Sequence, residues 1–261
     1  MKKTLTMPLV LLAFLVLPFF QIVAQDMKTM LEEGDKYYKE FKNEKALEVY
    51  KKADVKYPDN WEILWRISRA YVDIGEHMPT STSDQEKAQL AKYQLAYDYS
   101  NKAVQLAPNQ ALPYIRRAIV NGRIALFKGV FSVADVVNAV RDDCEKAIKL
   151  GNGGDDNQAI AHYVLARTHA KISEKWAPAR AVLGLGWAEL DSSFVHFKKA
   201  IALKANFVMF HLDYAKALIA DDNYKEARKN LNIVLKCAIE DEDDAVKKDE
   251  AKQLLKEIEN E

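Results

Sequence analysis

Two stretches of this chain repeat one skeleton of small or aromatic residues followed by a proline. The first copy is Ala46, Tyr50, Ala53 and Pro58, and the second is Ala96, Ser100, Ala103 and Pro108. Both copies have offsets of 4, 3 and 5 residues. Offsets of three and four place side chains on one face of a helix, and a proline does not continue that helix. The repetition therefore predicts a chain built from similar helical units.

Gly34 and Tyr37 precede Ala46 and complete the first copy. With them, the unit resembles a tetratricopeptide (TPR) repeat, in which two antiparallel helices pack closely through small residues. The resemblance implies an all-α fold, a right-handed superhelix of tetratricopeptide-like helical hairpins with insertions. We expect about five hairpins and a C-terminal capping helix over residues 25–261. The close contacts would lie at Gly34, Ala46, Ala96, Ala166, Ala200 and Ala227.

Two insertions interrupt the regular spacing. The first contains residues 78–84 and is expected to lengthen the following helix upstream, with Ser83 or Asp84 as its N-terminal cap. The second, residues 176–187, carries Trp176 and Trp187 at its ends. We expect it to cover the concave groove as a lid or to close the solenoid as a plug, with both indoles buried. If it is exposed instead, its apolar surface would be a docking patch for a partner.

The first 24 residues have the pattern of a secretory signal peptide. Lys2 and Lys3 precede an apolar run over residues 7–20, which is shorter than the roughly 20 residues that cross a bilayer. We expect cleavage after Ala24 and, because no cysteine lies near that site, a product without a lipid anchor or an integral membrane span. The predicted location is the periplasm or the medium.

Charge and cysteine content narrow the classes of partner. The chain has 38 Lys and Arg residues against 38 Asp and Glu residues, a balance that gives no reason to expect nucleic acid or an anionic membrane as partner. Cys144 and Cys237 lie at apolar helical positions, which favours core packing. Export would also permit a disulfide between them, and the sequence leaves that open.

In a solenoid of this type, the first helix of each hairpin lines the concave surface. One recurrent position on these helices is apolar or aromatic: Leu31, Trp65, Ile115, Tyr163 and Leu212. The position one turn later is mostly basic: Asp35, Arg69, Ile119, Arg167 and Lys216. An apolar floor bordered by guanidinium groups suits an apolar or extended ligand that carries a carboxylate.

The predicted binding residues combine this surface with the second insertion: Trp65, Arg69, Ile115, Tyr163, Arg167, Lys216, Trp176 and Trp187. A structural role is the alternative for each of them. Apolar helix residues also bury against the next repeat, and arginines also pair with nearby acids.

Residues 61–70, with the sequence WEILWRISRA, resemble the opening helix of the regulator of microtubule dynamics family. Later features follow in the same order: an elongated helix through residues 97–106, a tryptophan-containing segment at 175–180, and the run at 200–207. The resemblance spans about residues 27–255 and implies a non-catalytic, all-helical protein of TPR type. The link to microtubules in the family's name is not carried over to an exported chain.

Catalytic and metal-binding patterns are missing from the sequence. His162 and His169 are seven residues apart on one helix, too far to share a metal ion, and the acidic run 240–244 lacks the spacing of a calcium loop. The glycine-rich run 151–154 follows no strand and precedes no phosphate-binding lysine. We therefore expect no catalytic residues, no metal and no cofactor.

The leading functional hypothesis is a protein- or peptide-binding scaffold in the cell envelope. The alternative is a periplasmic accessory to a transporter that binds a small hydrophobic or organic-acid ligand. A closed pocket beneath residues 176–187 would favour the accessory protein, whereas an unobstructed groove would favour the scaffold. A hydrolase on a helical fold is a third class, for which no set of residues can be named.

Overall fold

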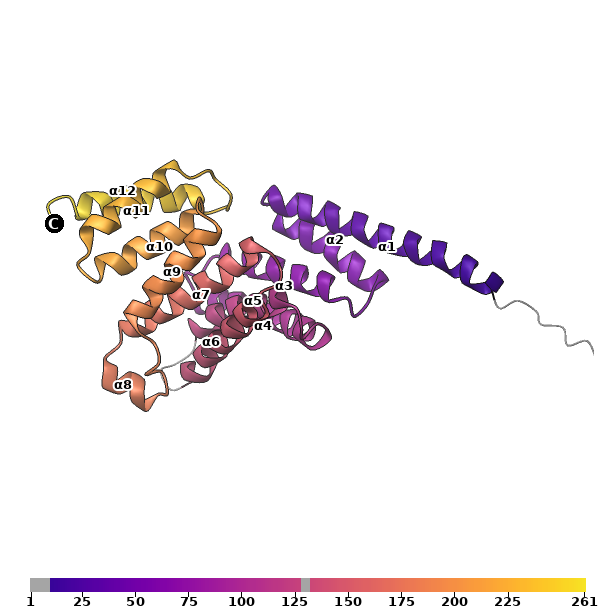
Figure 1. Cartoon of the computed structure of the whole chain (residues 1–261), viewed down its shortest axis with the longest axis horizontal. Coiled ribbons are helices and arrows are strands. Elements are labelled where there is room, and N and C mark those ends of the chain that lie inside the picture. Colours follow the sequence, from indigo (N-terminus) through magenta and orange to yellow (C-terminus); the bar gives the residue numbers. More distant parts are fainter. Residues whose placement is uncertain (1–9, 128–131) are drawn as a thin grey trace, which may run out of the picture.

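The computed structural model describes residues 10–127 and 132–261, with side chains from Gln25 onward within those ranges. Their helices (Figure 1) are α1 (Val10–Lys39), α2 (Asn43–Lys56), α3 (Trp61–Glu76), α4 (Ser83–Leu106), α5 (Ala111–Ala125), α6 (Val133–Leu150), α7 (Asp155–Ser173), α8 (Ala177–Val182), α9 (Leu190–Leu203), α10 (Val208–Ile219), α11 (Tyr224–Lys236) and α12 (Asp244–Glu257). The side chains of the predicted signal peptide, residues 1–24, lie outside the described part. Among the helices that are described, none combines the length and apolar character that a membrane crossing requires.

The helices pack as consecutive hairpins. The pairs are α1 with α2, α3 with α4, α5 with α6, α7 with α9, and α10 with α11, and α12 packs on α10 and α11. Each hairpin also packs against the next, for example α2 on α3 and α4 on α5. This arrangement confirms the predicted all-α fold of paired helices with a C-terminal cap.

Close approach of the helices in the first hairpin depends on Gly34. A Cβ atom at Gly34 would lie 2.7 Å from Cδ1 of Tyr50 and closer still to Cε1, so no larger residue fits without moving that ring. Gly75 makes the equivalent contact in the second hairpin, where a Cβ would lie 2.7 Å from Cε1 of Tyr93. The other small residues predicted at close contacts are fully buried: Ala46, Ala96, Ala166, Ala200 and Ala227. The sequence therefore identified the contact positions correctly.

The first insertion lengthens α4 at its N-terminus, as predicted, but the predicted cap was wrong. Thr82 is the N-cap: its side chain accepts a hydrogen bond from the backbone N–H of Gln85. The side chain of Gln85 in turn accepts from the backbone N–H of Thr82 at 3.1 Å. This reciprocal pair satisfies two amide groups that the first turn of a helix leaves free, which neither Ser83 nor Asp84 does here.

The last hairpin returns to the beginning of the superhelix. The acidic loop between α11 and α12 reaches α2 and α3, so that the two ends of the described solenoid meet (Figure 1). Nδ2 of Asn43 donates to Oε2 of Glu242 at 3.1 Å, and Nε2 of His77 lies 3.2 Å from Oδ1 of Asp243. We call this set of contacts the latch. It ties the C-terminal end of the superhelix to its first two hairpins.

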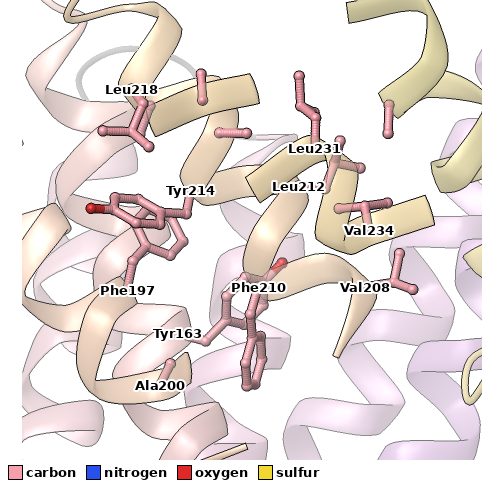
Figure 2. Close-up of a cluster of buried hydrophobic side chains, with 14 of the residues drawn as sticks. Tyr163, Phe197, Ala200, Val208, Phe210, Leu212, Tyr214, Leu218, Leu231 and Val234 are labelled. Atoms are coloured by element: carbon pink, nitrogen blue, oxygen red, sulfur yellow. The ribbon is translucent and has the colours of Figure 1, made fainter. Parts of the chain in front are cut away.

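Aromatic stacking fixes the C-terminal half of the solenoid. Figure 2 shows Tyr163 of α7 beside Phe210 of α10, and Phe197 of α9 beside Tyr214 of α10. The ring centroids are 4.8 Å apart in the first pair and 5.4 Å in the second. Such pairs contribute about 0.5–1.5 kcal/mol each beyond the burial of their area. This core holds α7 and α10 rigidly where they face the groove.

The second insertion contains α8 and packs against α6 and α7. Leu185 is buried against Ala134 and Val137, and Nε1 of Trp187 donates to Oδ1 of Asn138 at 2.8 Å. Trp176 is 75% exposed, so the expectation that both indoles are buried was wrong. The reason is geometric: the turn before α8 directs Trp176 away from the helices that hold Trp187.

Both cysteines are buried free thiols. Cys144 lies in a cluster with Val140 and Leu165, whereas Cys237 belongs to the C-terminal core. The structure thus places them in core packing, the arrangement that their positions on the helices favoured.

Candidate functional site: the concave groove

The first helices of all five hairpins face one hollow of about 790 Å³, which we call the groove. It runs from Asp35 on α1, past Trp65 on α3 and Ile119 on α5, to Tyr163 on α7 and Phe210 on α10. A second hollow of about 380 Å³ adjoins it. The two share their lining at Glu76, Arg123, Leu126, Arg167, Met209 and Asp241. Together they form the concave interior that a TPR superhelix is expected to present.

The structure brings five of the predicted binding residues to these hollows. Trp65, Arg69, Tyr163 and Arg167 line the groove, and Lys216 lines the smaller hollow. Trp65 and Tyr163 are 7% and 4% exposed, so they form the floor and not a protruding rim. None of the lining residues described comes from 176–187, so that segment is not a lid over the groove; it packs against α6 and α7 instead. Trp176 and Trp187 therefore lie away from the other predicted residues.

Ile115 was expected to face the groove, and this expectation was wrong. It is fully buried and packs with Ala111, Ala147 and Ala161 between neighbouring hairpins. The face of α5 that lines the groove is instead Leu112, Arg116, Ile119 and Arg123. These residues have helical spacing, but their stripe is rotated from Ile115 toward the next residue.

Three arginines surround the indole of Trp65. The guanidinium carbons of Arg66, Arg69 and Arg116 lie 4.3, 4.9 and 5.3 Å from its ring centroid. Arg69 also packs against Tyr38, whose ring centroid is 3.4 Å from the guanidinium carbon. Stacking on aromatic faces keeps the edges of a guanidinium, where its donors lie, available for hydrogen bonds.

Two of these arginines share one carboxylate. Nε and Nη2 of Arg66 lie 3.1 and 3.0 Å from Oδ2 of Asp35, and Nη2 of Arg69 donates to Oδ1 of Asp35 at 3.0 Å. The hydroxyl of Tyr50 also donates to Oδ1, at 2.6 Å. Although burial opposes the shift, these hydrogen bonds lower the pKa of Asp35. Asp35 is thus ionised, and both of its carboxylate oxygens already accept hydrogen bonds from Arg66, Arg69 or Tyr50.

Arg116 has no such partner. It makes no ion pair and no hydrogen bond with any described residue, and its Nε is buried without an acceptor. Nε of Arg69 is likewise buried without an acceptor. Burial, with the repulsion from Arg69, lowers the pKa of Arg116 to about 10, so the group is still charged at neutral pH. We call Arg69 and Arg116, with the flanking rings of Tyr38 and Trp65, the arginine subsite.

Two carboxyl groups follow on the next turns of α3. Burial, together with the charge of Glu76, raises the pKa of Asp73 to about 7, despite the nearby charges of Arg69 and Arg116. Oδ2 of Asp73 has no hydrogen-bond donor in the described structure. Glu76 forms an ion pair with Arg123, and burial raises its pKa. Near neutral pH, Asp73 therefore compensates only part of the positive charge at the arginine subsite.

A closed network surrounds Asp213 where the groove and the smaller hollow adjoin. Oδ2 of Asp213 accepts from the hydroxyl of Tyr163 at 2.6 Å and lies 3.0 Å from Nε of Arg167. Oδ1 lies 3.6 Å from Nζ of Lys216, which also pairs with Glu250 at 2.6 Å. We call this set the Asp213 network. Each of its cations has a carboxylate partner, in contrast to Arg116.

Three histidines of α7 and α9 cluster without an arrangement that would hold a metal ion. Nδ1 of His162 lies 2.9 Å from Nδ1 of His196, and the rings of His169 and His196 stack at 5.8 Å. Burial and the two neighbouring imidazoles lower the pKa of His196 to about 4, so it is neutral at ordinary pH. In the part of the chain that is described, no group of three or more His, Cys, Asp or Glu residues is arranged to hold a metal ion.

The sequence interpretation missed the residues that make the floor distinctive: Tyr38, Asp73, Glu76, Arg116 and Arg123. A signal for two of them was present, because Asp73 and Glu76 continue the helical stripe of Trp65 and Arg69 along α3. Arg116 carried no separate signal, since finding it requires the rotation of α5 about its axis.

Comparison with known proteins places this geometry in context. The profile of regulator of microtubule dynamics proteins 1–3 matches residues 30–259. Regulator of microtubule dynamics protein 2 from Bos taurus is 24% identical over 200 residues, covering 74% of this chain and 47% of that protein. The Mus musculus protein of the same name is 25% identical over 207 residues, covering 77% and 48%. The chain thus spans about half the length of these relatives.

Solved structures agree on the fold. A thermophilic TPR protein of Thermus thermophilus superposes with a TM-score of 0.63 at 15% identity, covering 87% of this chain and 99% of that one. The pilF protein of Pseudomonas aeruginosa superposes with a TM-score of 0.56 at 11% identity, covering 90% and 93%. At these identities, the similarity establishes a TPR-like architecture and nothing finer.

Proposed function

Because the chain belongs to the regulator of microtubule dynamics 1–3 family and has a TPR-like fold, we propose that it is a non-catalytic scaffold whose groove binds an extended segment of a partner protein. The observation that carries the proposal is the continuous groove of about 790 Å³, which contacts the first helix of every hairpin. Its lining alternates aromatic floor residues with charged groups, the combination that gives anchoring and orientation to a bound segment.

Gly122 offers a direct test of this proposal. It lies on α5, lines the groove, and a Cβ at this position would meet nothing within 4 Å. Gly122→Phe therefore adds a ring to the groove without a clash at its Cβ, and Gly122→Ala is the matched control that leaves the space open. Both variants replace a glycine within a helix, which favours folding by about 0.4–1 kcal/mol.

The measurement is binding of random peptides displayed on phage to the purified chain, followed by fluorescence polarisation with synthetic copies of those selected. We expect Gly122→Phe to abolish binding and Gly122→Ala to preserve it. Equal binding to both variants would place the peptides outside the groove, and failure to select any peptide would contradict the scaffold proposal.

The transporter-accessory alternative has less support. It calls for a closed pocket beneath residues 176–187, and the described residues of that segment line neither hollow. The open run of the groove along the first helices suits an extended polypeptide better than a small enclosed ligand.

We also propose that the chain is exported and acts in the cell envelope. The support is the sequence pattern of residues 1–24, in which two lysines precede an apolar run that ends near Ala24. Intact-mass measurement of the protein isolated from its own cells tests this point. An N-terminus at Gln25 is expected, whereas a chain that retains Met1–Ala24 would contradict the proposal.

A further inference from the structure

The charges at the floor of the groove do not balance. Around Trp65, three guanidinium groups meet three carboxyl groups: Asp35, which is shared by Arg66 and Arg69; Glu62, whose Oε2 lies 3.7 Å from Nη1 of Arg66; and Asp73, which is part-protonated near neutral pH. Arg116 forms no ion pair among the described residues, and only the part-protonated Asp73 offsets its charge. The Asp213 network shows that this fold can neutralise groove cations when a carboxylate is in reach.

Unused donors accompany this excess charge. Nε of Arg69 and Nε of Arg116 are both buried and both lack an acceptor. Buried donors are nearly always satisfied in folded proteins, and those that are not mark positions where another molecule completes the hydrogen bonds. Since both residues line the groove, an acceptor on a groove ligand can reach them.

The aromatic rings make these donors selective for a flat anion. The rings of Tyr38 and Trp65 both pack against the Arg69 guanidinium, and Trp65 also lies against Arg116. Covered faces exclude water and leave the guanidinium edges as the only polar approach. A carboxylate is planar and can accept two parallel hydrogen bonds from such an edge.

From these observations we infer that the arginine subsite binds a carboxylate of an acidic peptide segment, supplied by a Glu or Asp side chain or by a chain terminus. The inference rests on the proposed function, because it assigns a ligand group to the same groove. Arg116 is its principal residue: it contributes binding and no structural ion pair. Arg69 supports it while anchored to Asp35 and Tyr50.

The test uses the phage-displayed random peptides described above, selected in parallel on the wild-type chain, on Arg116→Gln and on Lys198→Gln. Lys198 is exposed and lines neither hollow, so its variant controls for the loss of one positive charge. We expect acidic residues to be enriched on the wild type and on Lys198→Gln, and not on Arg116→Gln. Peptides selected without acidic enrichment on the wild type would overturn the inference and leave the scaffold proposal intact.

Synthetic peptides then identify the source of the carboxylate. Each selected peptide is compared with its Glu→Gln or Asp→Asn form and with its C-terminally amidated form. The form that lacks the carboxylate bound by Arg116 is expected to bind at least roughly tenfold more weakly, as for a lost charge-assisted hydrogen bond. Unchanged affinity for every neutralised form would contradict the inference.

Stability provides the readout that separates binding from structure. Because Arg116 has no ion-pair or hydrogen-bond partner among the described residues and is repelled by Arg69, Arg116→Gln, which can keep the contact with Trp65, is expected to leave the midpoint of thermal unfolding unchanged or raised. A clear fall in that midpoint, together with equal loss of acidic and neutralised peptides, would show that Arg116 has a structural role instead. Arg116→Lys gives a second variant, which keeps the charge and loses the planar fork; intermediate affinity is expected.

Discussion

The arginine subsite and the Asp213 network lie in different parts of the concave interior and differ in how their charges are matched. At the Asp213 network, one carboxylate receives a tyrosine hydroxyl, a guanidinium and an ammonium group. At the arginine subsite, Arg116 forms no ion pair or hydrogen bond with a carboxylate of the described residues, and the nearby Asp73 is part-protonated near neutral pH. Arg69 and Arg167 stand at equivalent positions of two repeats, yet their surroundings differ. The position in the repeat therefore determines which way the arginine points, and the neighbouring residues determine whether its donors are available for a ligand.

The arginine subsite and the Asp213 network should differ most in how much they stabilise the fold. Asp213→Ala leaves Arg167 and Lys216 with fewer partners and the buried hydroxyl of Tyr163 without its acceptor, so we expect a loss of roughly 2–4 kcal/mol. Arg116→Ala removes no ion pair with a described residue and is expected to change the free energy of unfolding little. Urea unfolding of both variants measures this difference. Equal losses of unfolding free energy in the two variants would show that Arg116 is as important for stability as Asp213.

Gly34→Ala is expected to disturb the arginine subsite from a distance. The new methyl group overlaps the ring of Tyr50, whose hydroxyl donates to Asp35 and accepts from Arg69. Overpacking of this kind costs about 1–3 kcal/mol. Affinity for an acidic peptide should fall as well, while the Asp213 network is unaffected. The comparison would fail if the variant lost stability with no effect on binding of acidic peptides.

Acidic pH should favour the folded state at Asp73. Because its pKa is raised from 3.8 to about 7, the folded chain holds this proton more tightly than the unfolded chain does. The stabilisation is therefore present at low pH and is lost as pH rises between those two values. Asp73→Asn removes this loss, so the variant should gain more stability over the wild type at about pH 8 than at about pH 5. A gain independent of pH, in paired denaturation curves, would contradict the assignment.

The latch holds the acidic loop between α11 and α12 against Asn43 and His77, and its contribution to stability should depend weakly on pH in the same sense. Burial opposes protonation of His77, but hydrogen bonds to the backbone oxygen of Asp73 and to Asp243 raise its pKa. Its contribution is complete below the ordinary value near 6.5 and is lost as pH rises through the raised pKa. His77→Gln should cost about 0.2–1 kcal/mol at low pH and less at high pH, because the pair is partly exposed. An NMR titration of the His77 imidazole measures the pKa directly, and an ordinary or lowered value would exclude the latch contact.

The sequence predicted the hairpins and their close contacts because those depend on local spacing. Gly34 and the buried alanines recur at fixed offsets, and the position of Trp65 and Arg69 follows from the same periodicity. Partners in space were not predictable in this way. Asp213 meets Tyr163 from 50 residues away, and Arg116 faces the groove through a helix rotation that periodicity leaves uncertain by one residue.

Residues 176–187 also show that sequence predicts packing better than the orientation of a single side chain. Their composition predicted an apolar segment that packs on the solenoid, and Leu185 and Trp187 do so. The direction of Trp176 depends on the turn before α8, which composition does not specify. Packing class was therefore predictable, and the exposure of one indole was not.

A double-mutant cycle tests the central claim, that an unpaired arginine in the groove binds a carboxylate of a partner segment. Arg116→Gln is combined with neutralisation of the acidic residue in the tightest selected peptide, and the four affinities are measured by titration calorimetry. The account predicts a coupling energy of about 1 kcal/mol or more between the two changes. Additive losses, with no coupling, would contradict it.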